Sequence, residues 1–222
     1  MAVYTVMNKS LLVTRPNHDI TVNYLFFWCN PILDLAKMKN FAIHDLSAKK
    51  AEIKEFESHM RARKPALLFL NGHGTESSIT GQDNKPIIGM NVDEDVIKDS
   101  IIYARSCRAA KQLGPLLIRK KAKAFMGYKR DFVFMYQSDH VTKPLQDKIA
   151  RLFLNPSNLG VRVIIKGHPV KEAFYRSQRL LHKNLMRSLS SAASKEENDA
   201  APSLLWNLNS KVLIGDKNAS IN

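Results

Sequence analysis

Two kinds of segment alternate along the chain when apolar and polar positions are followed in order. Short, continuously apolar runs, such as residues 66–70, are typical of parallel strands that are buried on both faces. Longer stretches with an apolar residue every three or four positions are typical of amphipathic helices. The apolar runs predict strands at 10–14, 41–44, 66–71, 100–105 and 123–128, and the helical pattern predicts helices within 19–38 and at 47–63, 93–98 and 108–120.

The last third of the sequence is less regular. It predicts a helix at 140–154, a turn at 155–157, a short strand at 161–165, a long helix at 169–190, a mobile surface loop at 190–200 and a closing edge strand at 211–216. Strands that alternate with helices build parallel sheets with helices on both faces. We therefore expect one α/β domain over residues 1–222, a three-layer αβα sandwich around a mainly parallel sheet of about six strands.

The composition is that of an ordinary globular protein, with 45% hydrophobic and 24% charged residues, but the net charge is +14. A clustered excess of Lys and Arg would indicate a nucleic-acid surface. Residues 1–70, 71–137 and 138–222 carry +4, +4 and +6, so the excess is spread along the chain, and the densest cluster, 119–123, falls at a predicted helix end. Nucleic acid is therefore a partner that the sequence allows but does not favour.

Other segments bear on location and cofactors. The longest apolar runs are shorter than the roughly 20 residues of a membrane span, and residues 1–9 lack the layout of a secretory signal. Cys29 and Cys107 form no disulfide or metal motif, and the histidines show no metal-ligand spacing. We expect a cytoplasmic protein that contacts no membrane and needs no metal or cofactor.

Two strand ends carry residues that could perform chemistry. The strand at 66–71 runs into Gly72, His73 and Gly74, and the strand at 100–105 delivers Cys107 to the predicted helix at 108–120. A helix N-terminus and adjacent arginines would favour the thiolate of this cysteine. Taken alone, the Gly72–Gly74 segment would be a tight loop that happens to contain a histidine, and Cys107 would be a buried thiol without a chemical role. Together, at the carboxyl ends of two parallel strands, they form the arrangement in which a histidine activates a cysteine.

At these residues the chain resembles the caspase-like cysteine peptidases, the group of caspases, gingipains, clostripain, separase and bacterial CHAT domains. The resemblance consists of His73-Gly74 at one strand end and Cys107, 34 residues later, at the next. It extends to the segments 123–132, 167–174, 204–207 and 213–216, in the order found in stand-alone prokaryotic members.

The resemblance implies a peptidase in which Cys107 is the nucleophile, His73 moves its proton, and the amides of Gly74 and Cys107 stabilise the oxyanion. It implies a polypeptide substrate, no obligatory third carboxylate, and, by analogy alone, a regulatory partner in a signalling or defence module. Asp131 lies where relatives carry a carboxylate for a substrate Arg or Lys; because Lys129 and Arg130 precede it, an internal salt bridge is the alternative. Arg105, if it points into the pocket, would instead favour an acidic residue. Glu76, in the polar loop 75–84 after His73, is a further candidate for substrate binding.

Two other readings remain open. The chain could be a catalytically silent caspase-like domain that binds a protein or nucleic acid, although it retains both His73 and Cys107. It could also be a flavodoxin-like nucleotide binder, but it contains neither G-x-G-x-x-G nor a Walker sequence. The favoured reading is a cysteine endopeptidase that cleaves after Arg or Lys.

Overall fold

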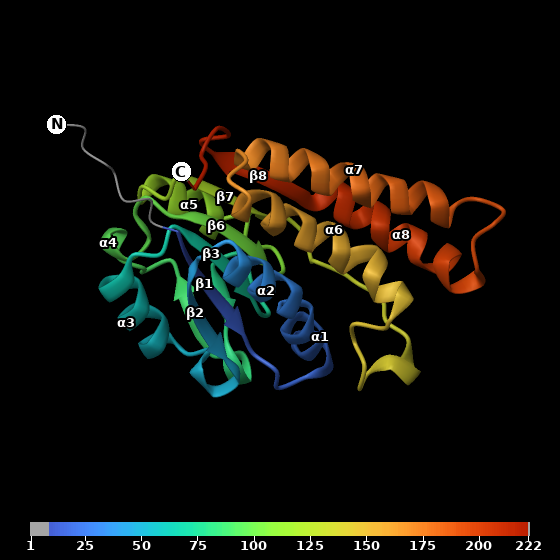
Figure 1. The fold of residues 1–222 in the computed structure, drawn as a ribbon, viewed down its shortest axis with the longest axis horizontal. Helices are drawn as coiled ribbons and strands as arrows, with labels where there is room; N and C mark the ends of the chain where they lie inside the picture. Colours follow the sequence, from blue (N-terminus) through green and yellow to red (C-terminus); the bar gives the residue numbers. More distant parts are fainter. Residues whose placement is uncertain (1–8, 222) are drawn as a thin grey trace.

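A six-stranded sheet forms the centre of the molecule (Figure 1). The computed structural model describes residues 9–221. Its strands follow the order β2-β1-β3-β6-β7-β8, in which β8 alone runs antiparallel to its neighbour. The predicted parallel strands and the closing edge strand are thus confirmed. Their bounds are β1 (Ser10–Arg15), β2 (Ala42–Ser47), β3 (Leu67–Asn71), β6 (Ile101–Arg105), β7 (Ala124–Tyr128) and β8 (Lys211–Gly215).

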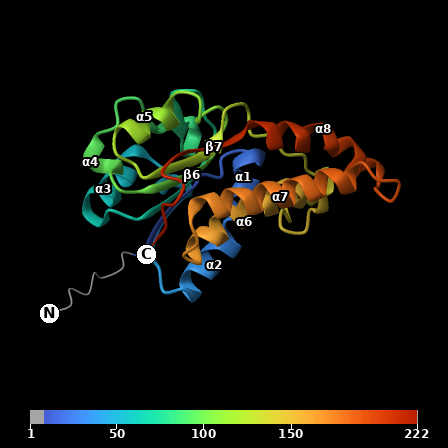
Figure 2. The same cartoon turned by 90° about the horizontal axis from the view of Figure 1, so that it is seen from above.

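Helices cover both faces of this sheet, as continuously apolar strands require. On one face lie α1 (Ile20–Trp28), α2 (Asn30–Met38), α6 (Lys148–Ile165) and α7 (Val170–Ser188). On the other lie α3 (Ile53–Arg63), α4 (Glu94–Ile97), α5 (Leu113–Arg119) and the antiparallel hairpin of β4 (Ser78–Thr80) and β5 (Pro86–Gly89). A final helix, α8 (Lys195–Ser210), packs on α6 and α7, so these three run side by side (Figures 1 and 2).

Helix α6 is the largest departure from the predicted elements, because it runs unbroken through Pro156, where a turn and a strand were expected. Proline within a helix removes the hydrogen bond to the carbonyl four residues earlier. Here the Asn184 side chain of α7 donates to that carbonyl, of Leu152, at 2.7 Å. The Ser177 hydroxyl also donates to the Pro156 carbonyl at 2.7 Å. The neighbouring helix therefore replaces the lost hydrogen bond, which local sequence cannot show.

Several smaller predictions also need correction. The loop expected at 190–200 is shorter, because residues 195–200 are the first turns of α8, started by a capping box between Ser194 and Glu197. The polar loop 75–84 contains β4 and the 3-10 turn η2 (Gln82–Asn84). The helix expected at 108–120 begins only at Leu113, and the helix expected within 19–38 is divided at Cys29, just before Pro31.

None of the helices between residues 9 and 221 combines the length and the apolar composition that a membrane span requires. Residues 1–8, on which the expectation of no secretory signal rests, lie outside the described residues.

Candidate functional site

The two predicted site residues lie at the same edge of the sheet. Asn71 and Arg105 are register partners in the parallel pair β3–β6, and His73 and Cys107 each follow two residues later. The loops that carry them are in direct contact, because the Ser106 hydroxyl donates to the His73 carbonyl at 3.0 Å. The sheet therefore brings the predicted base and nucleophile to neighbouring positions.

Gly74 permits this contact between the two loops. A Cβ at this position would lie 2.0 Å from the Ser106 hydroxyl oxygen and 2.9 Å from the Cys107 carbonyl oxygen, closer than real atoms approach. Gly74 also forms an isolated bridge with Ile79 of β4, at its non-hydrogen-bonded position, since the flanking bonds join residues 80 to 73 and 75 to 78. The Gly74 N–H consequently points away from the hairpin.

A carboxylate holds the His73 ring from a third strand end. The His73 Nε2 atom lies 2.6 Å from Asp19 Oδ2, and Asp19 is the N-cap of α1, accepting the Val22 N–H at 2.9 Å. Burial acts to raise the pKa of Asp19, but the hydrogen bonds from Val22 and His73 outweigh it and hold that pKa below its ordinary value. An ionised carboxylate accepts only, so in the neutral imidazole Nε2 carries the proton and Nδ1 keeps a lone pair.

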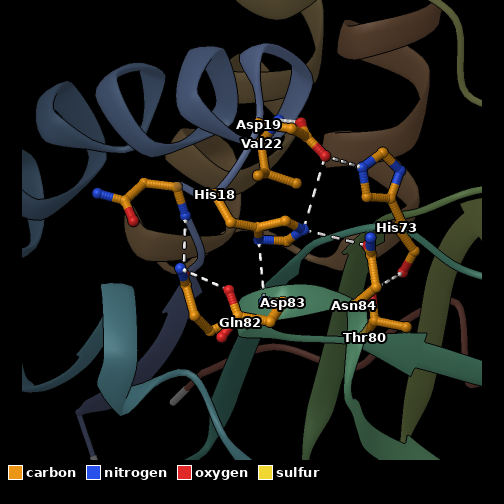
Figure 3. Close-up of polar contacts among 9 residues, drawn as sticks. His18, Asp19, Val22, His73, Thr80, Gln82, Asp83 and Asn84 are labelled. Carbon is orange, nitrogen blue, oxygen red and sulfur yellow. Dashed lines mark hydrogen bonds and ion pairs between the residues drawn. The ribbon is translucent and has the colours of Figure 1, made fainter.

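His18 approaches the same carboxylate from the other side (Figure 3). Its Nε2 lies 3.6 Å from Asp19 Oδ2 and 3.1 Å from the Asn84 side-chain oxygen, and its Nδ1 accepts the Asp83 N–H at 3.1 Å. The ligand atoms of His18, Asp19 and His73 lie within 4.8 Å of one another, close enough to hold a metal ion. Because Nδ1 accepts, however, Nε2 of His18 must carry a proton, and a metal would have to replace it. The arrangement fits a hydrogen-bonded chain better than a metal centre.

The environment of Cys107 differs from the expected one. No helix begins at this residue, since residues 108–112 form turns before α5. The thiol is half-buried and its Sγ lies 3.9 Å from the Phe132 carbonyl oxygen. Burial raises the pKa of the thiol above its ordinary value, and the Asp131 carboxylate adds to this effect. A hydrogen bond with the Phe132 backbone and the positive charge of Arg108 lower the pKa, but by less. The prediction of a stabilised thiolate is therefore wrong: the resting side chain is a thiol.

This protonation state predicts the pH dependence of alkylation. Because only the thiolate reacts, and the pKa of Cys107 is raised, we expect the rate of Cys107 modification by iodoacetamide to climb about tenfold per pH unit from about pH 7 to about pH 9. The rate is measured by mass spectrometry of the labelled peptide. Cys29, fully buried, is the internal control and should stay unlabelled while the protein is folded. A rate that is flat over this range would reveal a thiolate already formed at neutral pH.

The prediction that Arg105 could reach the substrate pocket is wrong. Its side chain is fully buried between the sheet and the helices α1, α2 and α6. The guanidinium donates to the Asn71 and Asn158 side chains at 2.6 and 3.1 Å. It also lies 3.2 Å from both the Leu25 carbonyl oxygen and Cys29 Sγ. Arg105 thus ties β6 to β3, α1 and α6 and cannot select a substrate side chain.

The other two predicted substrate-binding residues, Glu76 and Asp131, line one hollow of about 440 Å³ beside the cysteine loop. Both carboxylates are already paired: Glu76 with Lys111 at 2.5 Å, and Asp131 with Arg108 at 3.0 Å. We call this hollow the Glu76–Asp131 hollow. The whole set of its lining residues is Glu76, Arg108, Lys111, Lys129, Arg130, Asp131 and Trp206.

Asp19 and His18 are the site residues that sequence reasoning missed. The polar run 16–19 directly follows β1, so it forms a third strand end beside those of His73 and Cys107. Neither residue belongs to the two strand ends that carry His73 and Cys107, and the family resemblance implies no obligatory third carboxylate. An Asp that can cap a helix, next to a histidine, was the available signal.

Comparison with known proteins gives structural matches only. No family model and no curated protein matches the sequence. Among solved structures, the Arg specific cysteine proteinase gingipain R has a TM-score of 0.61 at 10% identity, over 96% of this chain and 47% of that one. The complex of Porphyromonas gingivalis RgpB pro- and mature domains gives 0.59 at 10% identity, over 96% and 48%. The fold is caspase-like.

The match to gingipain R extends over almost all of this chain. Its caspase-like fold agrees with the three-layer sandwich predicted from the strand pattern. At 10% identity it establishes the fold and leaves the chemistry to be argued from the residues. The chain spans about half the length of these neighbours. The resemblance to CHAT domains and to stand-alone prokaryotic members stays a prediction.

Proposed function

We propose that this protein is a cysteine endopeptidase that acts through Cys107 and His73. The observation that carries the proposal is the His73 ring, oriented by Asp19 and placed on the loop that is packed against Ser106 and Cys107. Sγ of Cys107 attacks the scissile carbonyl carbon, and its proton passes to Nδ1 of His73. The C–N bond breaks, the leaving amine takes that proton, and a thioester remains. Water then hydrolyses the thioester and restores the thiol.

The raised pKa of Cys107 suits this order of events. A thiol that is protonated at rest needs a base when the substrate is in place, and a histidine with a free Nδ1 can supply it. The amides of Gly74 and Cys107 are proposed to bind the developing oxyanion. Supporting this role, the Gly74 N–H faces away from β4, and within the described chain it donates to no other backbone group.

The Glu76–Asp131 hollow is proposed to receive a substrate side chain. Cleavage after Arg or Lys would place the basic side chain on Asp131, as the Arg specificity of the structurally similar gingipain R suggests by analogy. It would have to displace Arg108, and an exposed pair of this kind contributes only about 1 kcal/mol or less. A substrate carboxylate would instead meet Lys129 and Arg130, which also line the hollow.

Fluorogenic peptides that end in Arg, Lys, Asp or Glu separate these two preferences. Faster hydrolysis after Arg or Lys supports the predicted role of Asp131. Faster hydrolysis after Asp or Glu would instead mean that Lys129 and Arg130 bind the substrate side chain in the hollow. A cytoplasmic location and a regulatory partner stay predictions that these assays do not address.

The peptidase itself is tested with peptidyl chloromethyl ketones ending in Arg or in Asp, followed by mapping of the adduct. We expect one adduct, on Cys107, and its loss in His73→Ala, because the base is required for attack on a substrate-like group. Cys29 again serves as the internal control. Equal, slow labelling of both cysteines would contradict the proposal and support a catalytically silent domain.

Asp19→Asn is expected to lower kcat by about 10- to 100-fold, a part of the effect of general acid–base catalysis, with little change in KM. The amide lacks the charge that holds the proton on Nε2 of His73, so Nδ1 is free less often. Steady-state kinetics on the best fluorogenic peptide measure this effect. Asp93→Asn is the matched control, since Asp93 is an exposed carboxylate paired with Arg61 at 2.6 Å, far from the site. Equal kinetics in both variants would remove Asp19 from the mechanism.

A further inference from the structure

The positive charge of the C-terminal third is concentrated in one segment. Residues 162–187, which cover the end of α6 and nearly all of α7, contain seven Lys or Arg and one acidic residue. This segment alone therefore carries +6, the whole excess of residues 138–222. Most of this charge lies on α7, which carries Lys171, Arg176, Arg179, Lys183 and Arg187.

Helix α7 lies between α6 and α8 and runs along the top of the molecule in the view of Figure 1 (Figures 1 and 2). Exposed residues recur along it every four positions, about 6 Å apart: Lys171, Tyr175, Arg179 and Lys183. With the exposed Arg176 they form what we call the α7 basic face. Glu172, the acidic residue of the segment, is already engaged by Arg176 and by His168. Within residues 9–221, Lys171, Arg179 and Lys183 have no acidic partner.

Tyr175, at the centre of this face, is 63% exposed and lies between two hollows. One, of about 440 Å³, is lined by Pro169, Glu172 and the cations Lys171, Arg176 and Arg179 besides the tyrosine. The other, of about 260 Å³, is lined by the apolar side chains of Phe174, Val212 and Leu213 and by Lys171 and Lys217. The third lysine there, Lys211, is buried and its ammonium donates to Ser177. The ring of Tyr175 is thus flanked by apolar surface and rimmed by positive charge.

We propose that the α7 basic face binds single-stranded nucleic acid. Unpaired bases have flat apolar faces that stack on exposed aromatic rings, and their phosphates pair with lysine and arginine along a groove. An apolar hollow beside Tyr175 that is also lined by Lys171 and Lys217 suits a base with its adjoining phosphate. An acidic polypeptide would satisfy the cations, but it would leave the ring and the apolar hollow without a partner.

This binding is independent of the peptidase chemistry. The α7 basic face lies on a helix, whereas Cys107 and His73 lie beyond strand ends, and the two sites share no residue. A variant that has lost the nucleophile should therefore bind nucleic acid as well as the parent chain does. Failure of the peptidase proposal and failure of this one would be seen in different assays.

The experiment measures fluorescence anisotropy of a labelled oligouridylate of about 12 nucleotides, titrated with the full chain at several salt concentrations. We expect Kd values of about 1–100 µM at moderate salt, weakening steeply as salt is raised. Tyr175→Ser is expected to weaken binding about tenfold through lost stacking. Lys171→Glu with Arg179→Glu is expected to weaken it at least as much and to reduce the slope of log Kd against log salt by about 1.4, since each phosphate contact contributes about 0.7.

The matched control is Lys49→Glu with Lys50→Glu, which makes the same change in net charge at exposed positions of the turn after β2. It should change Kd by no more than about twofold, and Cys107→Ala should not change it. Equal weakening in the Lys49/Lys50 variant would overturn the proposal, because net charge alone would then explain binding. Competition by polyglutamate at the same charge concentration, together with no effect of Tyr175→Ser, would overturn it in favour of an acidic polypeptide.

Discussion

Cys107→Ala and His73→Ala are each expected to lower kcat/KM for peptide hydrolysis by about a thousandfold or more, and the double variant should be no worse than either one. In the proposed mechanism the two residues act as a unit: without the base the raised pKa of Cys107 leaves little thiolate, and without sulfur the base has nothing to activate. Hydrolysis of a fluorogenic peptide at saturating and subsaturating concentrations measures kcat and KM separately.

Cys29→Ala is the control for this experiment, because it removes the other thiol at a fully buried position away from the reacting groups. Its activity should stay within a few-fold of the parent chain. If the two single substitutions instead multiply in the double variant, Cys107 and His73 contribute independently, and the proposed proton transfer between them is wrong. If activity survives Cys107→Ala, hydrolysis occurs elsewhere.

The strand ends that carry Cys107 and His73 could be predicted because their signals are local. A buried strand has a continuous apolar run, its carboxyl end is marked by glycine or a polar residue, and parallel neighbours bring such ends together. Asp19 was not predicted because it lies 54 residues from its partner His73 in sequence. Their contact requires β1 and β3 to be adjacent in the sheet, which the pattern of neither strand shows. Its own local signal, a helix cap, has an ordinary structural explanation.

Pro156 shows the opposite failure, in which a strong local signal is overruled by tertiary contacts. Proline in a helical pattern predicts a break. In α6 the carbonyl of Leu152 loses its usual donor at Pro156, and the Asn184 side chain of α7 donates to that carbonyl instead. The helix therefore continues through the proline. Such compensation depends on residues 28 positions away and can be seen only in the fold.

Arg105 and Arg108 show how far a side chain's role depends on the direction in which it points. Both lie close to Cys107 in sequence, yet one is fully buried and the other lines an open hollow. In a strand, alternate residues face opposite sides, and Arg105 follows Tyr103 onto the face covered by α1 and α6. Beyond the strand the chain turns, and Arg108 adopts a positive φ of 56° that carries its side chain toward Asp131.

This contrast predicts a large effect on stability. Arg105→Ala is expected to lower the free energy of unfolding by about 3–5 kcal/mol, because it leaves buried acceptors on Asn71, Asn158 and Leu25 without a donor and opens a cavity. Part of the loss is offset, since the substitution also removes a buried cation that has no carboxylate partner among residues 9–221. For a chain of this size the melting temperature should fall by about 10 °C.

Arg108→Ala is the matched control, because it removes an identical side chain three residues after Arg105. Arg108 forms only an exposed ion pair with Asp131, so its loss should lower the free energy of unfolding by about 1 kcal/mol or less. Denaturant unfolding followed by circular dichroism measures both variants on one scale. Equal losses would mean that the Arg105 guanidinium does not hold β3 and β6 together. The expected difference instead makes Arg105 the residue that fixes the spacing between the His73 and Cys107 strand ends, so a variant that still folds at assay temperature should also lose kcat before KM.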